Sequence, residues 1–341
     1  MVVLAGLAGA ADVDGRARVW VGPGFDSNAR RDFVSPGYPT AADAFLYGLG
    51  QLEGQVTFDT GFRLQGSYDV AGRKFLLLPS EDTVLQALQV EALYGLSRIF
   101  NVGVFGRARD RRGAQRDYSD LQGGLAIDFL PDPHVDVRLA VAAHRFLYWD
   151  RFAYSWWGPD AQLTARYRFD RRHSLSVSGL YNPRTYNAVA VPHPPADGDP
   201  PPPDQTRSDV AFGAGVTYSY RGPFHLSGGY SYFDQTSNSL GETVRRHRFS
   251  MTLGLHLPWD LTLLAAGALQ LASYPDGVYL APELNVLEDD ENASSVSVKL
   301  VRPLVAHLEL DLRYAFFHNV LPNNGFVYQR HVVSIGLALS Y

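Results

Sequence analysis

The chain contains segments in which apolar residues alternate one by one with polar or small residues. Over residues 333–341 the alternate positions carry Val, Ile, Leu, Leu and Tyr, and the positions between them carry Ser, Gly, Ala and Ser. The same pattern occurs over residues 307–316, 248–257 and 135–142. Because successive side chains of a β-strand point to opposite faces, each segment predicts a strand with one apolar and one polar face.

A soluble barrel would turn the apolar faces of these strands inward. A single closed sheet of this size would then have to bury roughly a hundred apolar side chains, and about sixteen strands enclose too wide a lumen for that. If the apolar face instead meets lipid and the polar face lines water, the conflict disappears. The pattern therefore predicts an all-β, antiparallel, up-and-down transmembrane barrel.

The spacing of turn-forming residues gives the number of strands. Long polar or Pro-rich stretches at residues 26–41, 73–83, 111–118, 146–158, 182–208, 234–244, 272–293 and 317–327 predict eight long loops. Short turns are predicted between them, at residues 58–61, 98–101, 131–134, 170–173, 221–223, 258–260 and 302–304. Seven turns and eight loops connect sixteen strands, with fourteen or eighteen as alternatives, and short turns opposite long loops are typical of outer-membrane barrels. A β-propeller has a similar repeat length, but its strands are shorter than these segments.

Aromatic residues on the apolar phase form two groups. Phe58, Phe62, Phe129, Tyr167, Phe169, Tyr220 and Phe224 flank the short turns, whereas Tyr68, Tyr181, Tyr232, Tyr314 and Phe316 lie toward the long loops. Aromatic rings favour the headgroup zone of a bilayer, so the two groups predict the two membrane interfaces.

Composition excludes several other classes of protein. No uninterrupted apolar run approaches the roughly 20 residues of a transmembrane helix. The absence of Cys removes disulfides and thiolate sites, and the net charge of −5 gives no basic surface for nucleic acid. We expect no cofactor. Residues 1–11 are apolar and small, which predicts the end of a secretory signal peptide before a barrel domain over residues 12–341.

The carboxyl end resembles the C-terminal signal of Gram-negative outer-membrane barrels. A terminal aromatic residue, Tyr341, follows Ile335, Leu337 and Leu339 at alternate positions. In that family this signal is read by the barrel-assembly machinery, so the resemblance implies insertion into the outer membrane and contact with its lipid.

The polar phase supplies candidate pore-lining residues. Those singled out are Arg107, Arg109, Arg138, Arg166, Arg168, Asp120, Glu53, Glu91, Asp311 and Arg313. An arc of arginines would attract anionic groups on a passing solute. Alternatively, carboxylates such as Asp120, Asp128 and Asp136 lie close enough along the strands to neutralise some of these arginines.

A second resemblance involves Gly24, Phe25, Asp26, Ser27 and Asn28. This stretch is similar to a Gly-Tyr-Asp-Ser-Asn segment found in barrels that export exopolysaccharide or assemble surface lipoproteins. The resemblance implies a conduit for exopolysaccharide, and because the helical repeat domain of that group is missing from this sequence, it implies separate periplasmic export components as partners. An Asp-Ser-Asn stretch also caps turns, which is the structural alternative.

Other functions stay open at this stage. A general or solute-selective porin is the main alternative, although its inward-folded third loop has only a short counterpart at residues 111–118. A structural or adhesive barrel would need a closed lumen, and the small inward residues Gly213, Gly215, Gly336 and Ala338 argue against one. A lipid-processing enzyme would need a base on the outer face such as His331, but no Ser or acid lies beside it in the sequence. The acidic residues 288–291 predict either a Ca²⁺ site or a solvated loop.

Overall fold

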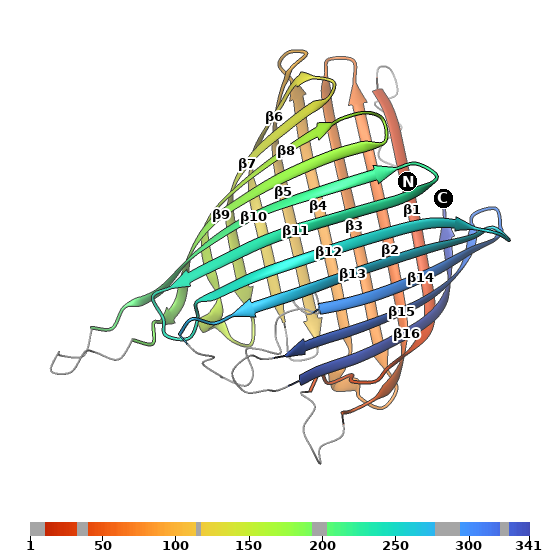
Figure 1. The fold of residues 1–341 in the computed structure, drawn as a ribbon. Helices are drawn as coiled ribbons and strands as arrows, with labels where there is room; N and C mark the ends of the chain where they lie inside the picture. The colour runs from red at the N-terminus through yellow and green to blue at the C-terminus, as the bar shows by residue number, and fades with distance from the viewer. Residues whose placement is uncertain (1–10, 33–39, 114–116, 193–202, 277–293, 321–326) are drawn as a thin grey trace.

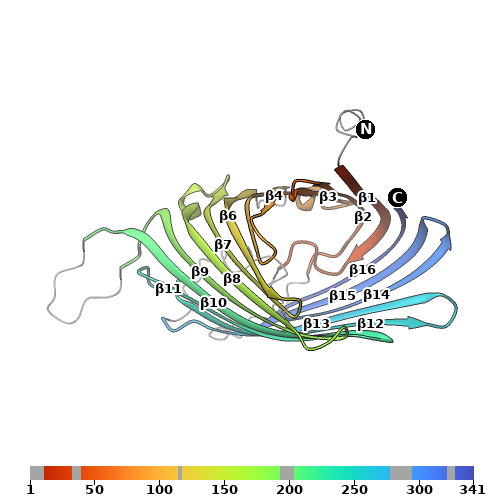
Figure 2. The same ribbon diagram turned by 90° about the horizontal axis from the view of Figure 1, so that it is seen from above.

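The computed structural model describes residues 11–32, 40–113, 117–192, 203–276, 294–320 and 327–341, and within them the chain forms one closed β-barrel (Figure 1). Each strand is antiparallel to its neighbours in sequence, and β1 pairs with β16 to close the wall, which Figure 2 shows from above. This confirms the prediction of a sixteen-stranded antiparallel barrel. The strands are β1 (Ala11–Asp26), β2 (Asp43–Phe58), β3 (Phe62–Phe75), β4 (Thr83–Gly95), β5 (Phe100–Gly113), β6 (Tyr118–Asp132), β7 (Val135–Tyr148), β8 (Trp156–Arg168), β9 (His173–Val189), β10 (Thr206–Arg221), β11 (Phe224–Ser237), β12 (Val244–Leu257), β13 (Leu261–Ser273), β14 (Ser294–Val305), β15 (Leu308–Val320) and β16 (Val327–Ser340).

Connections at the two ends of the barrel differ in length. Seven connections of two to four residues lie at the end that also holds both termini, and eight connections of four or more residues lie at the opposite end (Figure 1). We call these the periplasmic and the external end. Short 3-10 helices, η1 (Pro79–Glu81) and η2 (Phe152–Tyr154), lie in two of the external loops. Trp259 and Asp260, with φ of 64° and 58°, form the β12–β13 turn, because two successive positive φ angles match the twist of a tight hairpin.

Several predicted boundaries were wrong. The long loop predicted at residues 182–208 is shorter, because β9 continues to Val189 and β10 begins at Thr206. Polar residues there extend the hydrogen-bonded ladder beyond the apolar part of the strands. The turn predicted at residues 302–304 lies instead at residues 306–307, and a register shift next to Pro303 accommodates that residue, which has no amide proton to donate. The turn predicted at residues 98–101 covers residues 96–99.

The segment predicted as the end of a signal peptide lies almost entirely outside the described residues. Ala11 is described, and it is the first residue of β1, paired with Phe58 on β2. The prediction for residues 1–10 therefore stays a prediction. The acidic residues 288–291 and most of the Pro-rich stretch of the β9–β10 connection also lie outside the described residues.

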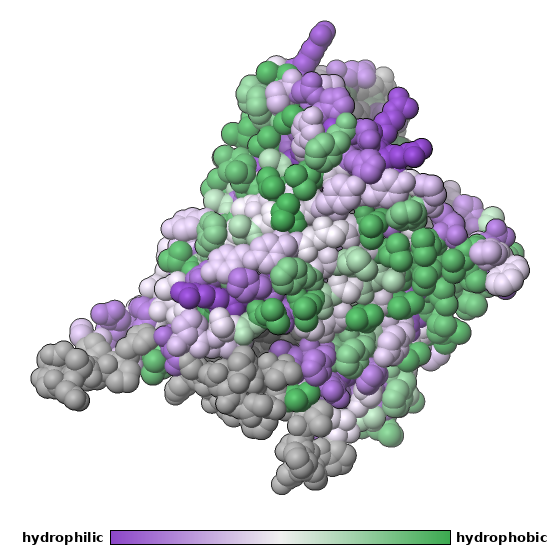
Figure 3. All heavy atoms as spheres, in the orientation of Figure 1, coloured by the Kyte–Doolittle hydropathy of each residue, from purple (hydrophilic) through white to green (hydrophobic). Residues whose placement is uncertain are grey.

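The apolar phase of the strands faces outward. On β1, Val19 and Val21 are 55% and 51% exposed, whereas Trp20 between them is fully buried on the inner side. Figure 3 shows hydrophobic residues over broad areas of the visible outer face, with hydrophilic ones at the top and in smaller patches at mid-height and near the lower edge. Apolar side chains in contact with water would be unfavourable over so large an area, so this face meets lipid. Among the described residues, no helix is long and apolar enough to span a membrane.

Aromatic side chains form the predicted girdle at the periplasmic end. Cross-strand or near-neighbour pairs have ring centroids 4.8 to 5.5 Å apart: Phe58 with Phe62, Phe100 with Phe129, Tyr167 with Phe169, and Tyr220 with Phe224. In the turn beyond this girdle, the Arg172 and His173 amides donate hydrogen bonds to Asp170 and hold the pKa of its carboxyl below the usual range. Rings at one level of the outer face are expected at a bilayer interface.

The external half of the outer face combines aromatic and polar groups. Tyr314 lies beside His331, with the hydroxyl oxygen 3.0 Å from Nδ1, and Tyr230 makes the same contact with His247 at 2.8 Å. Phe316 packs on the His331 ring, with centroids 4.7 Å apart. His331, considered above as the base of a lipid-processing enzyme, is therefore held by aromatic neighbours. Its backbone amide, rather than its imidazole, donates to Ser27 Oγ.

The seam between β1 and β16 closes the barrel by two kinds of contact. At the external end, Arg330 donates to both carboxylate oxygens of Asp26, with an Nη2–Oδ2 distance of 2.6 Å, and both residues are buried. Nearer the periplasmic end, Gly22 crosses so close to β16 that a Cβ atom there would lie 2.0 Å from the Ile335 carbonyl oxygen. The seam thus depends on a buried ion pair and on a glycine.

The stretch from Gly24 to Asn28 forms the junction between β1 and the first external loop. The Asn28 side chain accepts a hydrogen bond from the backbone amide of Asp32 and donates to the carbonyl oxygens of Asp32 and Gln329. The backbone amide of Asn28 donates to the Asp26 carboxylate. Together with the Asp26–Arg330 pair, these contacts give the stretch a structural role at the seam, as the turn-capping alternative predicted.

Candidate functional site: the barrel interior

Water-accessible residues line part of the inner wall. Small hydroxyl-bearing side chains on the inward phase of β8 to β12 are exposed: Thr164, Ser178, Thr217, Ser231, Ser250 and Thr252. The alternate positions, which face lipid, are apolar, as with Leu163, Val177 and Met251. Because both phases of these strands are exposed, the wall has solvent-accessible space on its inner side as well as lipid on its outer side.

The register places every predicted pore-lining residue on the inward phase. This applies to Arg107, Arg109, Arg138, Arg166, Arg168, Asp120, Glu53, Glu91, Asp311 and Arg313. Position alone does not give a residue a role in solute passage, so that part of the prediction stays a prediction. The contacts of these residues separate them into two groups.

The first group consists of residues that form ion pairs with one another across the inner wall. Arg138 on β7 reaches back to Glu91 on β4 and also contacts Asp128 at 3.1 Å. Arg313 and Lys299 both contact the fully buried Asp311 at 2.8 Å. Neutralisation of lumen charges, the alternative considered above, holds for these arginines. Their guanidinium groups bind carboxylates of the barrel wall and so have less charge to offer a passing solute.

Asp136 and Asp120 behave differently from each other. Asp136 lies 3.4 Å from Arg168, as its position suggested. Asp120 is the cross-strand partner of Arg109, yet its Oδ1 lies 2.6 Å from Nε2 of His144 on β7. Asp120 therefore contacts an imidazole as well, and the prediction that it neutralises an arginine stays a prediction. A pairing between two strands in the sheet fixes which residues are opposite but not which way a long side chain turns.

Two lumen arginines form the second group. Arg107 and Arg166 are exposed, and within the described ranges neither has a carboxylate partner. The Arg107 guanidinium lies 5.1 Å from the centroid of the Phe105 ring, and Arg166 Nε donates to Ser176 Oγ at 3.3 Å. Because these contacts leave the positive charge uncompensated, Arg107 and Arg166 are the lumen cations best placed to act on a solute.

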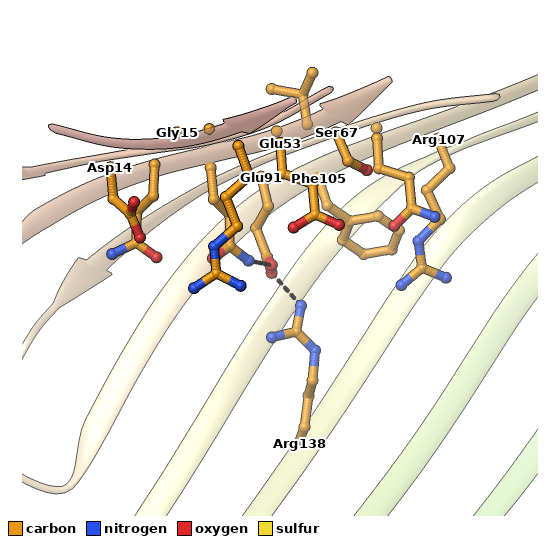
Figure 4. Close-up of a pocket in the computed structure, with 16 residues that line it drawn as sticks. Asp14, Gly15, Glu53, Ser67, Glu91, Phe105, Arg107 and Arg138 are labelled. Atoms are coloured by element: carbon orange, nitrogen blue, oxygen red, sulfur yellow. Dashed lines mark hydrogen bonds and ion pairs between the residues drawn. The ribbon is translucent and has the colours of Figure 1, made fainter. Parts of the chain in front are cut away.

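A cavity of about 390 Å³ lies against the inner wall on β1 to β7 (Figure 4). Its polar lining combines carboxylates, amides and guanidinium groups: Asp14, Arg16, Glu53, Gln55, Gln65, Gln89, Glu91, Arg107 and Arg138. Phe105 is the aromatic ring among them. In Figure 4, Glu91 and Arg138 point toward each other, and Gln65 Nε2 donates to Glu91 at 2.7 Å. The cavity therefore offers both donors and acceptors beside one ring.

A smaller cavity of about 210 Å³ lies nearer the external end. Arg31, Arg73, Arg109 and Arg111 line it together with Tyr47, and no carboxylate belongs to its lining. Sequence reasoning missed Arg31 and Arg73. Arg73 lies on β3 four residues after Asp69 and therefore on the same inward phase. The alternation pattern could have predicted it as a lumen-facing residue. Arg31 follows β1 in a loop, where no periodic signal exists. We call these four arginines the external arginine cluster.

Comparisons with known proteins concern the fold. No protein-family model and no curated protein sequence matches the chain. Among solved structures, a loop-deletion mutant of OmpT, an outer membrane protein of Vibrio cholerae, is 11% identical over 97% of this chain and 100% of that one, with a TM-score of 0.49. A bacterial polysaccharide outer membrane secretin is 9% identical over 95% and 98%, with a TM-score of 0.47. A mutant of the Rh. blastica porin is 8% identical over 97% and 100%, with a TM-score of 0.44.

These similarities are too distant to carry a function to this chain. The architecture itself is more informative: a closed sheet with a lipid-facing apolar exterior, an aromatic girdle, a water-accessible interior and short turns opposite long loops. These are the features of bacterial outer-membrane barrels. The protein is a sixteen-stranded β-barrel of the outer membrane.

Proposed function

We propose that the barrel is a passive diffusion channel of the porin type for small hydrophilic solutes. The observation that carries this proposal is the exposure of small hydroxyl-bearing residues on the inner wall of β8 to β12. A barrel filled by its own side chains would need bulky residues there, whereas a sixteen-stranded barrel with a short-chained polar wall leaves room for water. We assign no catalytic residue.

The distribution of lumen charge supports a preference for anionic solutes. The carboxylates Asp128, Asp136 and Asp311 are engaged by arginine or lysine, so these three present little negative charge to the lumen, whereas Glu53 has no cation partner among the residues that the structure describes. Arg107 and Arg166 lack such partners among the described residues. Fixed positive charge along a restricted aqueous path raises the local concentration of anions.

Replacing Arg107 and Arg166 together with Gln is expected to lower the anion-to-cation permeability ratio about twofold at low salt, because two uncompensated charges leave the lumen. The ratio is measured from the reversal potential of the refolded protein in a planar bilayer under a KCl gradient. The control is Arg168→Gln with Asp136→Asn, which removes an ion pair and leaves the net charge unchanged. An equal reversal potential in wild type and the Arg107/Arg166 variant would contradict the preference.

A saccharide conduit is the second candidate, favoured by the larger cavity. Its carboxylates and amides suit sugar hydroxyls, and the half-buried ring of Phe105 suits the apolar face of a pyranose. The resemblance of Gly24 to Asn28 to exopolysaccharide exporters pointed the same way and would require periplasmic export components as partners. The contacts of that stretch at the seam supply a structural reason for the same residues.

Oligosaccharides distinguish these two functions. If the cavity binds saccharides, neutral hexasaccharides are expected to block the conductance of the wild-type channel, and Phe105→Ala should weaken that block about threefold through lost ring contact. The measurement is current block against oligosaccharide concentration, with Phe233→Ala as a control ring on the inward phase of β11, away from the cavity lining. Absence of any block would remove the saccharide candidate and leave the diffusion channel.

A further inference from the structure

A groove with a volume of about 1010 Å³ lies across β4 to β8. Its floor is a row of small residues that are cross-strand partners on four adjacent strands: Gly106, Gly123, Ala143 and Pro159. The next row toward the external end carries larger side chains, including Leu88, Leu121 and Trp157. Small residues beside large ones make a depression in an otherwise even wall.

The groove opens to the membrane. Its lining side chains Leu88, Val90, Leu121 and Trp157 belong to the exposed apolar phase of their strands, and that phase faces lipid. Lumen-facing residues of the same strands, among them Gln122 and His144, also border the groove, because the wall is one sheet thick. The cavity beside Arg138 lies against the inner side of this wall, and it shares Val90, Gly106 and Arg107 with the groove.

Arg145 is the outward-facing charged side chain of this groove. It lies on the outward phase of β7 between its cross-strand partners Leu121 and Trp157, and it is exposed. In the described part of the chain it has no hydrogen-bond or ion-pair partner. The outward-facing carboxylate of this wall, Asp110 on β5, is already occupied by Arg112 at 2.8 and 2.9 Å and by Ser119 Oγ at 2.5 Å.

A charged guanidinium on a lipid-facing wall is unfavourable without a counter-ion, more so at mid-membrane than near the interface. Arg145 is three residues from the external end of β7, beside Trp157, a residue type that favours the headgroup level. A phosphate at this level would form charge-assisted hydrogen bonds with the guanidinium. Apolar chains attached to that phosphate would fill the groove below it.

We propose that this groove is a binding site for a phosphate-bearing, acylated lipid of the external leaflet. The phosphate pairs with Arg145, and an acyl chain lies over the row formed by Gly106, Gly123, Ala143 and Pro159. Arg145 and the row of small residues lie on the outward phase of their strands, so the contacts assigned to the lipid do not use lumen-facing side chains.

The test uses the refolded full-length protein in a non-ionic detergent with hexa-acylated, diphosphorylated lipid A as the probe. Native mass spectrometry is expected to show one retained lipid, with affinity reduced about tenfold in Arg145→Ala, since a charge-assisted pair is lost. Arg245→Ala is the matched control, because Arg245 is also an outward-facing arginine at the external end but is paired with Asp234 at 3.0 Å.

A second variant tests the groove without changing charge. In Gly123→Leu the side chain occupies the groove floor, and the backbone tolerates a Cβ atom, whose nearest neighbour would be the Phe105 carbonyl oxygen at 3.9 Å. This variant is expected to fold and to lose the lipid. Dephosphorylated lipid A should bind the wild-type protein no better than lipid A binds Arg145→Ala.

Three results would overturn the proposal. Equal retention of lipid A by the wild type, Arg145→Ala and Gly123→Leu would show that the groove is not the site. Equal affinity for the phosphorylated and dephosphorylated lipids would remove the role of Arg145. A dimer or trimer that excludes lipid and dissociates in Arg145→Ala would show that a second copy of the chain covers the groove.

Discussion

Replacing Arg330 with Ala is expected to lower the free energy of unfolding by about 3–5 kcal/mol, because it leaves the buried Asp26 carboxylate without its main counter-charge. Asp26 is fully buried and Arg330 is 1% exposed, so water cannot replace the lost hydrogen bonds without opening the seam. Arg73, 3.6 Å from Asp26, forms a second and longer ion pair that offsets only part of this loss. Equilibrium unfolding in urea, followed by Trp fluorescence in lipid vesicles, gives the free energy.

Arg112→Ala is the matched control for Arg330→Ala. Arg112 forms a bidentate pair with Asp110, but both side chains are substantially exposed, so its loss should change stability by less than about 1 kcal/mol. A double variant with Asp26→Asn and Arg330→Met should be more stable than Arg330→Ala, since no unpaired charge remains. A loss below 1 kcal/mol in Arg330→Ala would show that the seam does not depend on this pair.

Replacing Gly22 with Val is expected to have a comparable effect by a steric route. A Cβ atom at this position would lie 2.0 Å from the Ile335 carbonyl oxygen and 2.5 Å from the Gly336 Cα atom. These are backbone atoms of β16, so relief requires the two strands to separate, at a cost of about 3 kcal/mol. We expect the yield of folded barrel to fall severalfold. The yield is measured as the fraction of protein that stays folded in cold SDS.

Gly48 provides the control for the seam. It pairs with Val21 on the other side of β1, and a Cβ atom there would meet nothing within 4 Å. Gly48→Val should therefore fold with the yield of the wild-type protein. If Gly22→Val folded equally well, close approach of β1 and β16 would not be a condition of closure.

The faces and number of the strands could be predicted because each depends on a local pattern. Alternation assigns residues such as Val19 and Trp20 to opposite faces without knowledge of any partner, and turn residues mark where the chain reverses. The ends of the strands at the external side could not be predicted in the same way. β9 continues beyond the apolar pattern because β10 is there to pair with it, and that pairing is a tertiary property.

The charges of the lumen were predictable in position but not in contact. Arg138 bridges to Glu91 three strands away, and Asp120 contacts His144 on the neighbouring strand, and both contacts are set by side-chain reach across a curved wall. Arg31 joins the external arginine cluster from a loop that carries no periodic pattern. Asp26 and Arg330 are 304 residues apart in sequence, so the seam pair became recognisable only once β1 and β16 were adjacent.

The central claim is that the barrel interior conducts small hydrophilic solutes. Single-channel recording of the refolded wild-type protein in a planar bilayer tests it directly. The proposed function predicts discrete insertion steps followed by a steady current that is proportional to voltage at moderate potentials. A correctly folded barrel that inserts but carries no current would contradict the claim and show that the interior is closed.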